Sequence, residues 1–369
     1  MDRATRAKLA TGAAALVVIA QPARADDYVD TATKKADAAT ARADKWDGPT
    51  SGPAAAKGKK IVFVAGDLKN GGILGASEGV KEAAAAIGWT LTVIDGQGAV
   101  SSRTAGMNQA LTLKPDGIIV GGFDTKEQQV AFDAAAKAGV AVVGWHSGTR
   151  PGPEPEAGIF ANVTTLPQDV SETAAFEAIA ESKGKAGVVI FTDSQYEIAV
   201  FKARAMEAAI KKCGGCTVLE FVDSPIAESS QRMPQLTTTL LQKYGDRWTH
   251  SLAINDLYFD FMGPSLSAAG KKGDGAPLAI SAGDGSESAF QRIRAKQYQA
   301  GTVPEPLNQQ GWQLVDELNR AFAKAPWSGY VSKIHLVTAN NVAYDGGPRN
   351  VFDPDNGYRI QYKKIWGGK

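Results

Sequence analysis

Residues Lys60–Asp95, KIVFVAGDLKNGGILGASEGVKEAAAAIGWTLTVID, decide the fold. The apolar run Ile61–Ala65 has the length of a buried strand, and a Gly-rich polar loop follows it. Apolar residues then recur near a 3.6-residue spacing over Ile73–Ile87, which predicts a helix, and Leu91–Ile94 predicts a second strand. The stretch is therefore a β-loop-α-β unit. In a parallel sheet, the loop after each strand opens at the strand's carboxyl edge, where ligands bind.

The same unit recurs along the chain in two runs. In the first run, helical patterns alternate with strand patterns at residues 61–65, 91–94, 117–120 and 140–144. In the second run, they alternate with strand patterns at residues 187–191, 217–222, 251–254 and 278–281. Two doubly wound parallel α/β halves, joined near residues 161–165, are the simplest interpretation. One more helix is predicted over residues 309–325, and periodicity does not place residues 342–366.

The N-terminus has the pattern of a secretory signal peptide. A basic start precedes the apolar run Leu9–Ala20, and Ala23-Arg24-Ala25 is an A-x-A cleavage signal, so residues 1–25 are expected to be removed. A chance apolar helix is the alternative. Removal takes away four basic residues and one acidic residue, which changes the net charge from +1 to −2. This near-neutral balance gives no argument for binding nucleic acid or an anionic membrane.

The two cysteines form the motif Cys213-Gly-Gly-Cys216. An exported protein is in a compartment where disulfides persist. A thioredoxin-like pair needs its thiols at a helix N-terminus, where the helix dipole lowers their pKa. Here the pair follows the predicted helix and precedes a strand, which favours a structural disulfide or inert thiols.

Five segments, in this order along the chain, resemble the ribose-type periplasmic sugar-binding proteins, the type I solute receptors of ABC importers. The matching segments are GASEGVKEAA (75–84), VIDGQGAVSSRTAGMNQAL (93–111), LKPDGIIVGGFD (113–124), AINDLYF (253–259) and AISAGDGSE (279–287). The resemblance implies two Rossmann-like lobes, a three-segment hinge, and a small ligand clamped between the lobes. The expected N-terminal lobe is residues 58–162 plus 304–336, and the expected C-terminal lobe is residues 163–303 plus 337–369. Residues 26–57 form an extension and linker.

The resemblance also implies ligand contacts at Asn70, Asn255, Asp284 and Glu305. Each position has a purely structural alternative. Asn70 could stabilise a turn, Asn255 and Asp284 could cap the helices that follow them, and Glu305 could only fix a hinge.

The chain departs from the ribose type in two loops. Gly71 and Gly72 stand where that type has aromatic side chains, and His146-Ser147 stands where it usually has Asp-Arg. The fold inference is unaffected, but ribose itself is not expected as the ligand. His146 is a candidate contact, with a structural histidine as its alternative.

Three aromatic residues follow predicted strands and could supply a plane for the apolar face of a sugar: Phe123, Trp145 and Tyr196. Packing is the alternative for each. Gly71 and Asp124, at the ends of the first and third predicted strand-end loops, complete the candidate contacts.

A carboxylate accepts two ligand hydroxyls, and such charge-assisted hydrogen bonds are the stronger kind. The expected function is therefore a periplasmic receptor that delivers a sugar or polyol to an ABC permease in the inner membrane, acting as a monomer. A cationic ligand stays open, because Asp284 and Glu305 could hold one. The alternatives are a sensor feeding a chemoreceptor or kinase and an enzyme on the same lobes; a transcription regulator is opposed by the signal peptide.

No enzymatic or cofactor motif supports catalysis. Ser77 lies in a G-x-S-x-G pattern, but inside a predicted helix rather than on the turn after a strand. His146, His250 and His335 have no metal-ligand spacing. No nucleotide-binding glycine motif follows a strand, so no cofactor, metal or nucleic acid is expected.

Overall fold

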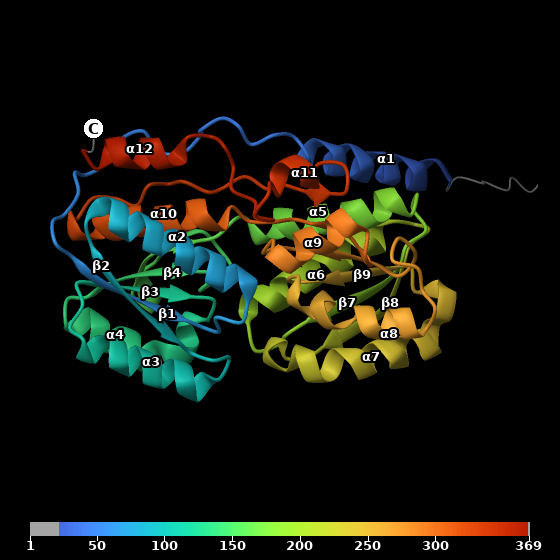
Figure 1. The fold of residues 1–369 in the computed structure, drawn as a ribbon, viewed down its shortest axis with the longest axis horizontal. Helices are drawn as coiled ribbons and strands as arrows, with labels where there is room; N and C mark the ends of the chain where they lie inside the picture. The colour runs from blue at the N-terminus through green and yellow to red at the C-terminus, as the bar shows by residue number, and fades with distance from the viewer. Residues whose placement is uncertain (1–21, 368–369) are drawn as a thin grey trace, which may run out of the picture.

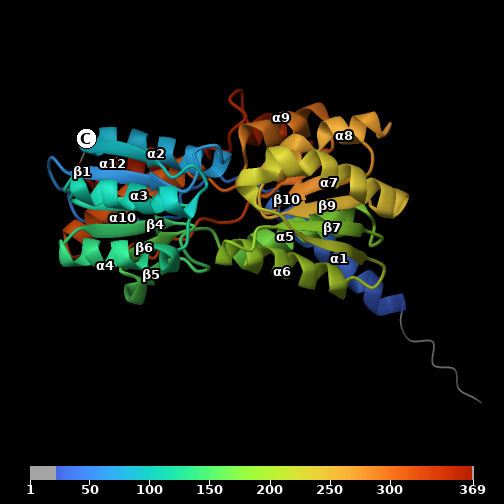
Figure 2. The same ribbon diagram turned by 90° about the horizontal axis from the view of Figure 1, so that it is seen from below.

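The computed structural model describes residues 22–367 as two α/β lobes that lie side by side (Figures 1 and 2). Each lobe has a six-stranded sheet, with strand orders β2-β1-β3-β4-β6-β5 and β12-β11-β10-β9-β7-β8. The strands are parallel except at one edge of each sheet, where β5 runs antiparallel to β6 and β12 runs antiparallel to β11. The predicted fold class, two doubly wound lobes, is confirmed.

The strands of the first lobe are β1 (Lys60–Ala65), β2 (Thr90–Asp95), β3 (Gly117–Gly121), β4 (Ala141–Trp145), β5 (Gly152–Glu154) and β6 (Ile159–Val163). Those of the second lobe are β7 (Gly187–Thr192), β8 (Thr217–Asp223), β9 (His250–Ala253), β10 (Leu278–Ser281), β11 (Gln299–Thr302) and β12 (Val337–Thr338).

The helices packed with the first sheet are α2 (Gly71–Ile87), α3 (Val100–Thr112), α4 (Gln129–Lys137), α10 (Leu307–Phe322) and α12 (Tyr358–Ile365). Those of the second lobe are α1 (Pro22–Ala39), α5 (Pro167–Glu181), α6 (Glu197–Lys212), α7 (Ser229–Tyr244), α8 (Gly263–Ala268), α9 (Glu287–Ala295) and α11 (Val342–Asp345). Short 3-10 helices occupy Thr125–Gln128, Pro155–Ala157, Ile226–Glu228, Gly245–Arg247 and Leu257–Phe261. None of the helices in the described part of the chain is long and apolar enough to cross a membrane.

The first unit forms as its sequence predicts. Successive side chains of β1 point to opposite faces of the sheet. Ile61 and Phe63 pack against α2 and α10 on one face, and Val62 and Val64 pack against α3 and α4 on the other. This two-sided burial explains the continuous apolar run. Helix α2 ends where Gly88 adopts a left-handed conformation, φ 80°, and its N–H bonds back to the last turn.

Strand β6 is missing from the predicted elements. Its fourth residue, Asn162, interrupts an apolar run and makes the segment resemble a loop. The side chain is nevertheless buried, because its Oδ1 accepts from the N–H of Ser147 at 3.0 Å and its Nδ2 donates to the carbonyl of Arg150 at 2.8 Å. Asn162 therefore anchors the loop after β4 from a core strand.

The N-terminal extension is part of the second lobe. The expected extension, residues 26–57, is helical as far as Ala39, where α1 ends, and Ala32 and Ala36 of this helix are buried in the second-lobe core against α5. Residues 1–21 of the predicted signal peptide lie outside the described residues. The predicted cleavage site after Ala25 falls in the first turn of α1.

The assignment of residues 337–369 to the second lobe needs correction. β12 and α11 do pack there, but α12 lies on the first lobe beside α10 (Figure 1). The ring of Trp312 on α10 stacks on Trp366 at 5.4 Å between centroids and meets Tyr358 edge to face. The aromatic residues of this segment are too widely spaced to show a periodic pattern. The sequence therefore did not indicate which lobe α12 packs against.

The chain crosses between the lobes five times within the described residues. Three crossings, at residues 164–166, 303–306 and 323–336, lie where a three-segment hinge was expected. Two more, at residues 40–59 and 346–357, connect α1 to β1 and α11 to α12. The outer segments are held to the central ones: Leu336 N–H donates to Ala39 O at 2.8 Å, and Tyr330 OH donates to Asp47 at 3.1 Å.

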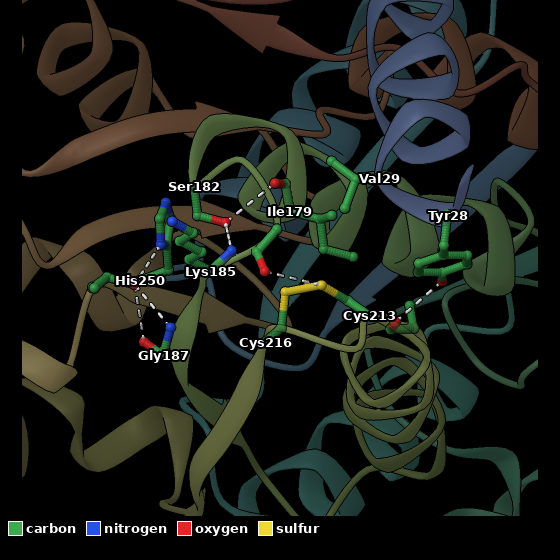
Figure 3. Close-up of a disulfide and its surroundings, with 12 residues drawn as sticks. Tyr28, Val29, Ile179, Ser182, Lys185, Gly187, Cys213, Cys216 and His250 are labelled. Atoms are coloured by element: carbon green, nitrogen blue, oxygen red, sulfur yellow. Dashed lines mark hydrogen bonds between the residues drawn. A yellow bond between two sulfur atoms is a disulfide. The ribbon is translucent and has the colours of Figure 1, made fainter. Parts of the chain in front are cut away.

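Cys213 and Cys216 are joined as a disulfide at the C-terminal end of α6 (Figure 3). The bond lies beside α1, where Tyr28 OH donates to the carbonyl of Ala209 at 3.1 Å. The N-terminus of α6 faces the other lobe. Because α6 has 16 residues, the disulfide is about 24 Å away from that end. The disulfide therefore has a structural place, far from the inter-lobe cleft.

Candidate functional site

A cavity lies between the lobes, at the carboxyl ends of the strands. Its polar lining comes from Asp67, Asn70, His146, Lys202, Asn255 and Asp284. Its apolar lining comes from Ile73, Trp145, Tyr196, Ile198, Ile226 and Ile254. The empty volume of the cavity, open mouth included, is about 620 Å³. The cavity therefore suits a small ligand.

Glycines at the start of α2 let the lobes approach each other. A Cβ added to Gly72 would lie 2.6 Å from the Asp284 side chain, and one added to Gly71 would lie 2.9 Å from Ser286 Cβ. Real Cβ atoms do not come so close. The ribose-type proteins have aromatic side chains at these two positions. Here the glycines have none, and this allows α2 to contact the second lobe.

Polar contacts across the cleft hold this closed arrangement. The fully buried Arg103 pairs with Glu127 at 2.6 Å and donates to Tyr196 OH of the second lobe at 3.3 Å. Asp124 accepts from the backbone N–H of Glu197 at 2.8 Å. Burial raises the pKa of Asp124 to about 6, although this hydrogen bond lowers it.

Two asparagines, one from each lobe, present amide donors. Asn70 Oδ1 caps α2 by accepting from the N–H groups of Gly72 and Ile73, at 2.9 and 3.3 Å. Asn255 Oδ1 accepts from Leu257 N–H at 3.2 Å. Asn70 therefore has a structural role as a helix cap rather than in a turn, and Asn255 holds the backbone at the start of the short helix Leu257–Phe261. Their Nδ2 groups make no hydrogen bond to any described residue, so each side chain keeps two N–H donors at the cavity.

Asp284 follows β10 and is 6% exposed. Its carboxylate receives no hydrogen bond from the described residues. The alternative that it caps α9 is wrong, because Ser286 Oγ accepts from Ala289 N–H there. Burial raises the pKa of Asp284 to about 6, although Lys202 and His146 lower it.

A second buried acid, Asp256, fixes the loop that carries Asp284. Its Oδ2 accepts from the N–H groups of Gly285 and Ser286, at 2.9 and 3.2 Å, and its Oδ1 accepts from Gln299 Nε2 at 2.7 Å. Sequence reasoning missed this role and chose only its neighbour Asn255.

Trp145 and His146 form one wall of the cavity as a stacked pair, with ring centroids 3.8 Å apart. His146 has φ 51°, a backbone conformation that non-glycine residues rarely adopt. Trp145 Nε1 donates to Gln310 Oε1 at 2.7 Å, so the indole N–H points to α10, behind the cavity wall.

Glu305 lies behind that wall, 2.8 Å from His146 Nε2. Its other oxygen accepts from Gln310 Nε2 at 2.7 Å and from Thr165 Oγ1 and N–H, at 2.9 and 3.2 Å. Burial alone would raise the pKa of Glu305, but His146 and Lys202 hold it well below its ordinary value. Because Thr165 and Glu305 belong to two hinge segments, Glu305 joins the hinge to the cavity wall.

Six of the ten predicted contacts line the cavity: Asn70, Trp145, His146, Tyr196, Asn255 and Asp284. Four do not. Gly71 meets Ser286, Phe123 packs in the first-lobe core, Asp124 binds the N-terminus of α6, and Glu305 sits behind His146.

Lys202 and Asp67 line the cavity without having been predicted. Lys202 lies in the second turn of α6, where a lysine in a helical pattern indicates a solvated face. The sequence did contain a sign that Lys202 is buried. Ala199, Ala203 and Met206 lie on the buried face of α6, and position 202 is next to them on the helix.

The arrangement offers hydrogen bonding and apolar contact, without a metal centre. In residues 22–367, no group of three or more His, Cys, Asp or Glu side chains is placed to hold a metal ion.

Comparison with known proteins agrees with this geometry. The model of the periplasmic binding protein domain family matches residues 61–325. The comparison with curated proteins gives no match.

Solved structures with the same fold include three solute-binding proteins of low sequence identity. A sugar ABC transporter protein from Yersinia enterocolitica has a TM-score of 0.70 and 15% identity, over 86% of this chain and 100% of that one. One from Agrobacterium vitis, bound to α-D-tagatopyranose, has 0.69 and 15%, over 80% and 99%. One from Bacillus halodurans, bound to myo-inositol, has 0.65 and 17%, over 77% and 96%.

Replacing Glu305 should destabilise the protein. Glu305→Ala leaves Thr165, Gln310 and His146 with buried donors that lack an acceptor, and breaking such a buried pair costs about 3–5 kcal/mol of unfolding free energy. Glu305→Gln keeps one acceptor oxygen and should lose less. Urea denaturation followed by circular dichroism measures both. Glu78→Ala, at an exposed pair with Lys81, is the control and should change little. Equal stability of Glu305→Ala and the wild type would contradict the role of Glu305.

Proposed function

The chain belongs to the periplasmic binding protein family, and we propose that it is the substrate-binding component of an ABC importer for a small sugar or sugar alcohol. The observation that carries this proposal is the unpaired Asp284 carboxylate in a closed cavity between two lobes. A buried carboxylate without donors is costly unless a ligand supplies them.

The chemistry of the cavity matches a polyol. Ligand hydroxyls can donate to Asp284 and accept from the free Nδ2 groups of Asn70 and Asn255. The Trp145 ring and the isoleucines offer apolar contact for the C–H faces of a carbon chain or ring. The ligands named for the Agrobacterium and Bacillus structures, a ketohexose and a cyclitol, are of this class.

The protein works by closing rather than by chemistry. Asn70, Trp145 and His146 come from the first lobe, whereas Lys202, Asn255 and Asp284 come from the second. Only the closed state gives a ligand both sets of contacts, so binding shifts the population toward it. An inner-membrane permease would then recognise the closed form of the monomer and receive the ligand.

Asp284→Ala should weaken binding more than any other single cavity substitution. It removes an ionised acceptor for two hydroxyls, and a loss of about 3 kcal/mol corresponds to roughly a hundredfold in Kd. Asp284→Asn should recover part of this, since one acceptor remains. Isothermal titration with the tightest binder from a panel of neutral sugars and polyols measures both. An unchanged Kd in a folded Asp284→Ala protein would remove Asp284 from the site.

Binding should weaken in acid. The ligand needs ionised Asp284, whose pKa in the empty closed cavity is raised to about 6 by burial. Affinity should therefore be complete above that pH and fall below it by up to about tenfold per pH unit, because binding must expel a proton. Titrations between pH 7.5 and pH 4.5 test this. Asp284→Asn should lose the dependence; a dependence that persists in this variant would show that Asp284 does not cause it.

We further propose export to the periplasm with cleavage after Ala25. The basic start, the apolar run and the A-x-A signal support it. N-terminal sequencing of protein released by osmotic shock should begin at Asp26. Recovery of residues 1–25 on that protein would exclude this cleavage.

A further inference from the structure

Lys202 is a buried cation without a hydrogen-bond partner. Its side chain is 4% exposed, and it lies on α6 beside the cavity-lining residues Ile198 and Ala199. Lysines are almost never fully buried unless they are paired. Among the described residues, only Glu305 brings an acidic oxygen within 4 Å of Nζ, at 3.9 Å, which is too long for a hydrogen bond.

Glu305 does not accept a hydrogen bond from Lys202, because the two atoms, Oε1 and Nζ, are 3.9 Å apart. One of its oxygens already accepts from Thr165 and Gln310, and the other lies 2.8 Å from His146 Nε2. The three N–H donors of Lys202 therefore find no acceptor on the described protein. The ammonium group borders the cavity, so an acceptor can come from a ligand.

The ammonium group also lies close to the loop that carries Asp284. A Cβ added to Gly283 would be 2.8 Å from Lys202 Nζ. No ion pair within 4.0 Å joins Lys202 to Asp284 in the described residues, although the charge of Lys202 acts on that carboxyl. Two opposite charges, Lys202 and Asp284, thus line the same cavity without a direct ion pair between them.

We propose that Lys202 is a ligand-binding residue, and that one ligand hydroxyl accepts a hydrogen bond from its Nζ while donating one to the Asp284 carboxylate. This inference rests on the proposed function and specifies its ligand as a neutral polyhydroxylated compound. A hydroxyl is the small group that both accepts and donates. Both of its hydrogen bonds are charge-assisted, which is the stronger kind.

The charges explain why the ligand is neutral. Lys202 and Asp284 balance each other when a hydroxyl lies between them. A ligand carboxylate would satisfy Lys202 but add an anion beside Asp284 and Glu305. A ligand ammonium would satisfy Asp284 but leave Lys202 facing a second cation. Either brings like charges together in a desolvated space, which is costly.

Lys202→Met tests the inference, because it keeps the length of the side chain and removes its charge and donors. Lys212→Met, at an exposed lysine near the end of the same helix, is the matched control. Thermal shift and isothermal titration are run with D-tagatose, myo-inositol, D-sorbitol and D-ribose, together with gluconate and glucosamine as the acidic and amino analogues.

The wild type should bind a neutral compound more tightly than gluconate or glucosamine. Lys202→Met should weaken that binding roughly tenfold or more, as expected for a lost hydrogen bond to a charged group, and Lys212→Met should not. Circular dichroism and the urea midpoint show whether each variant is folded.

Three results would overturn the inference while leaving the proposed function intact. One is an unchanged Kd in folded Lys202→Met, which would make Lys202 only a structural counter-charge to Glu305. The others are tighter binding of gluconate and tighter binding of glucosamine. A wild type that binds none of the panel would instead contradict the proposed function, and the inference would fall with it.

Discussion

The buried carboxylate of Glu305 joins three parts of the chain that must meet for the cavity to exist. One oxygen holds Thr165, from the crossing at residues 164–166, and Gln310, in the first turn of α10. The other faces His146, whose ring stacks on Trp145 to form the cavity wall. The position of the wall is therefore set from the hinge. A sugar-binding site needs such a fixed wall, because hydroxyl recognition depends on the exact direction of each hydrogen bond.

The polar groups in and around the cavity fall into two sets, those that form hydrogen bonds within the protein and those that do not. Asp256 accepts hydrogen bonds at both carboxylate oxygens and Glu305 accepts three at one oxygen, and these bonds fix the loops. Within the described residues, the Asp284 carboxylate accepts no hydrogen bond and the Nδ2 groups of Asn70 and Asn255 donate none, and these groups line the cavity. The polar groups that stabilise the fold thus form hydrogen bonds within the protein, whereas those that line the cavity are free to bind a ligand.

Much of the architecture was predictable because parallel strands buried on both faces give continuous apolar runs, as at residues 61–65. Family resemblance then placed Asn70, Asn255 and Asp284 at strand ends, where the structure has them. It could not show that Asn70 also caps α2, or that Glu305 turns toward the hinge, since both depend on atoms far away in sequence. Lys202 was missed because one sequence does not tell a buried lysine from a solvated one. The tail was misassigned because its partner, Trp312, is identified only by packing.

The position of α12 also constrains how the protein can fold. Tyr358, Tyr362 and Trp366 complete the core of the first lobe, but they are synthesised after the whole second lobe. The first lobe therefore cannot reach its native packing while the chain is still growing, and its final contacts close a loop of roughly 300 residues. Such non-local contacts form slowly. Completion of the first-lobe core therefore depends on α12, the last helix of the described chain.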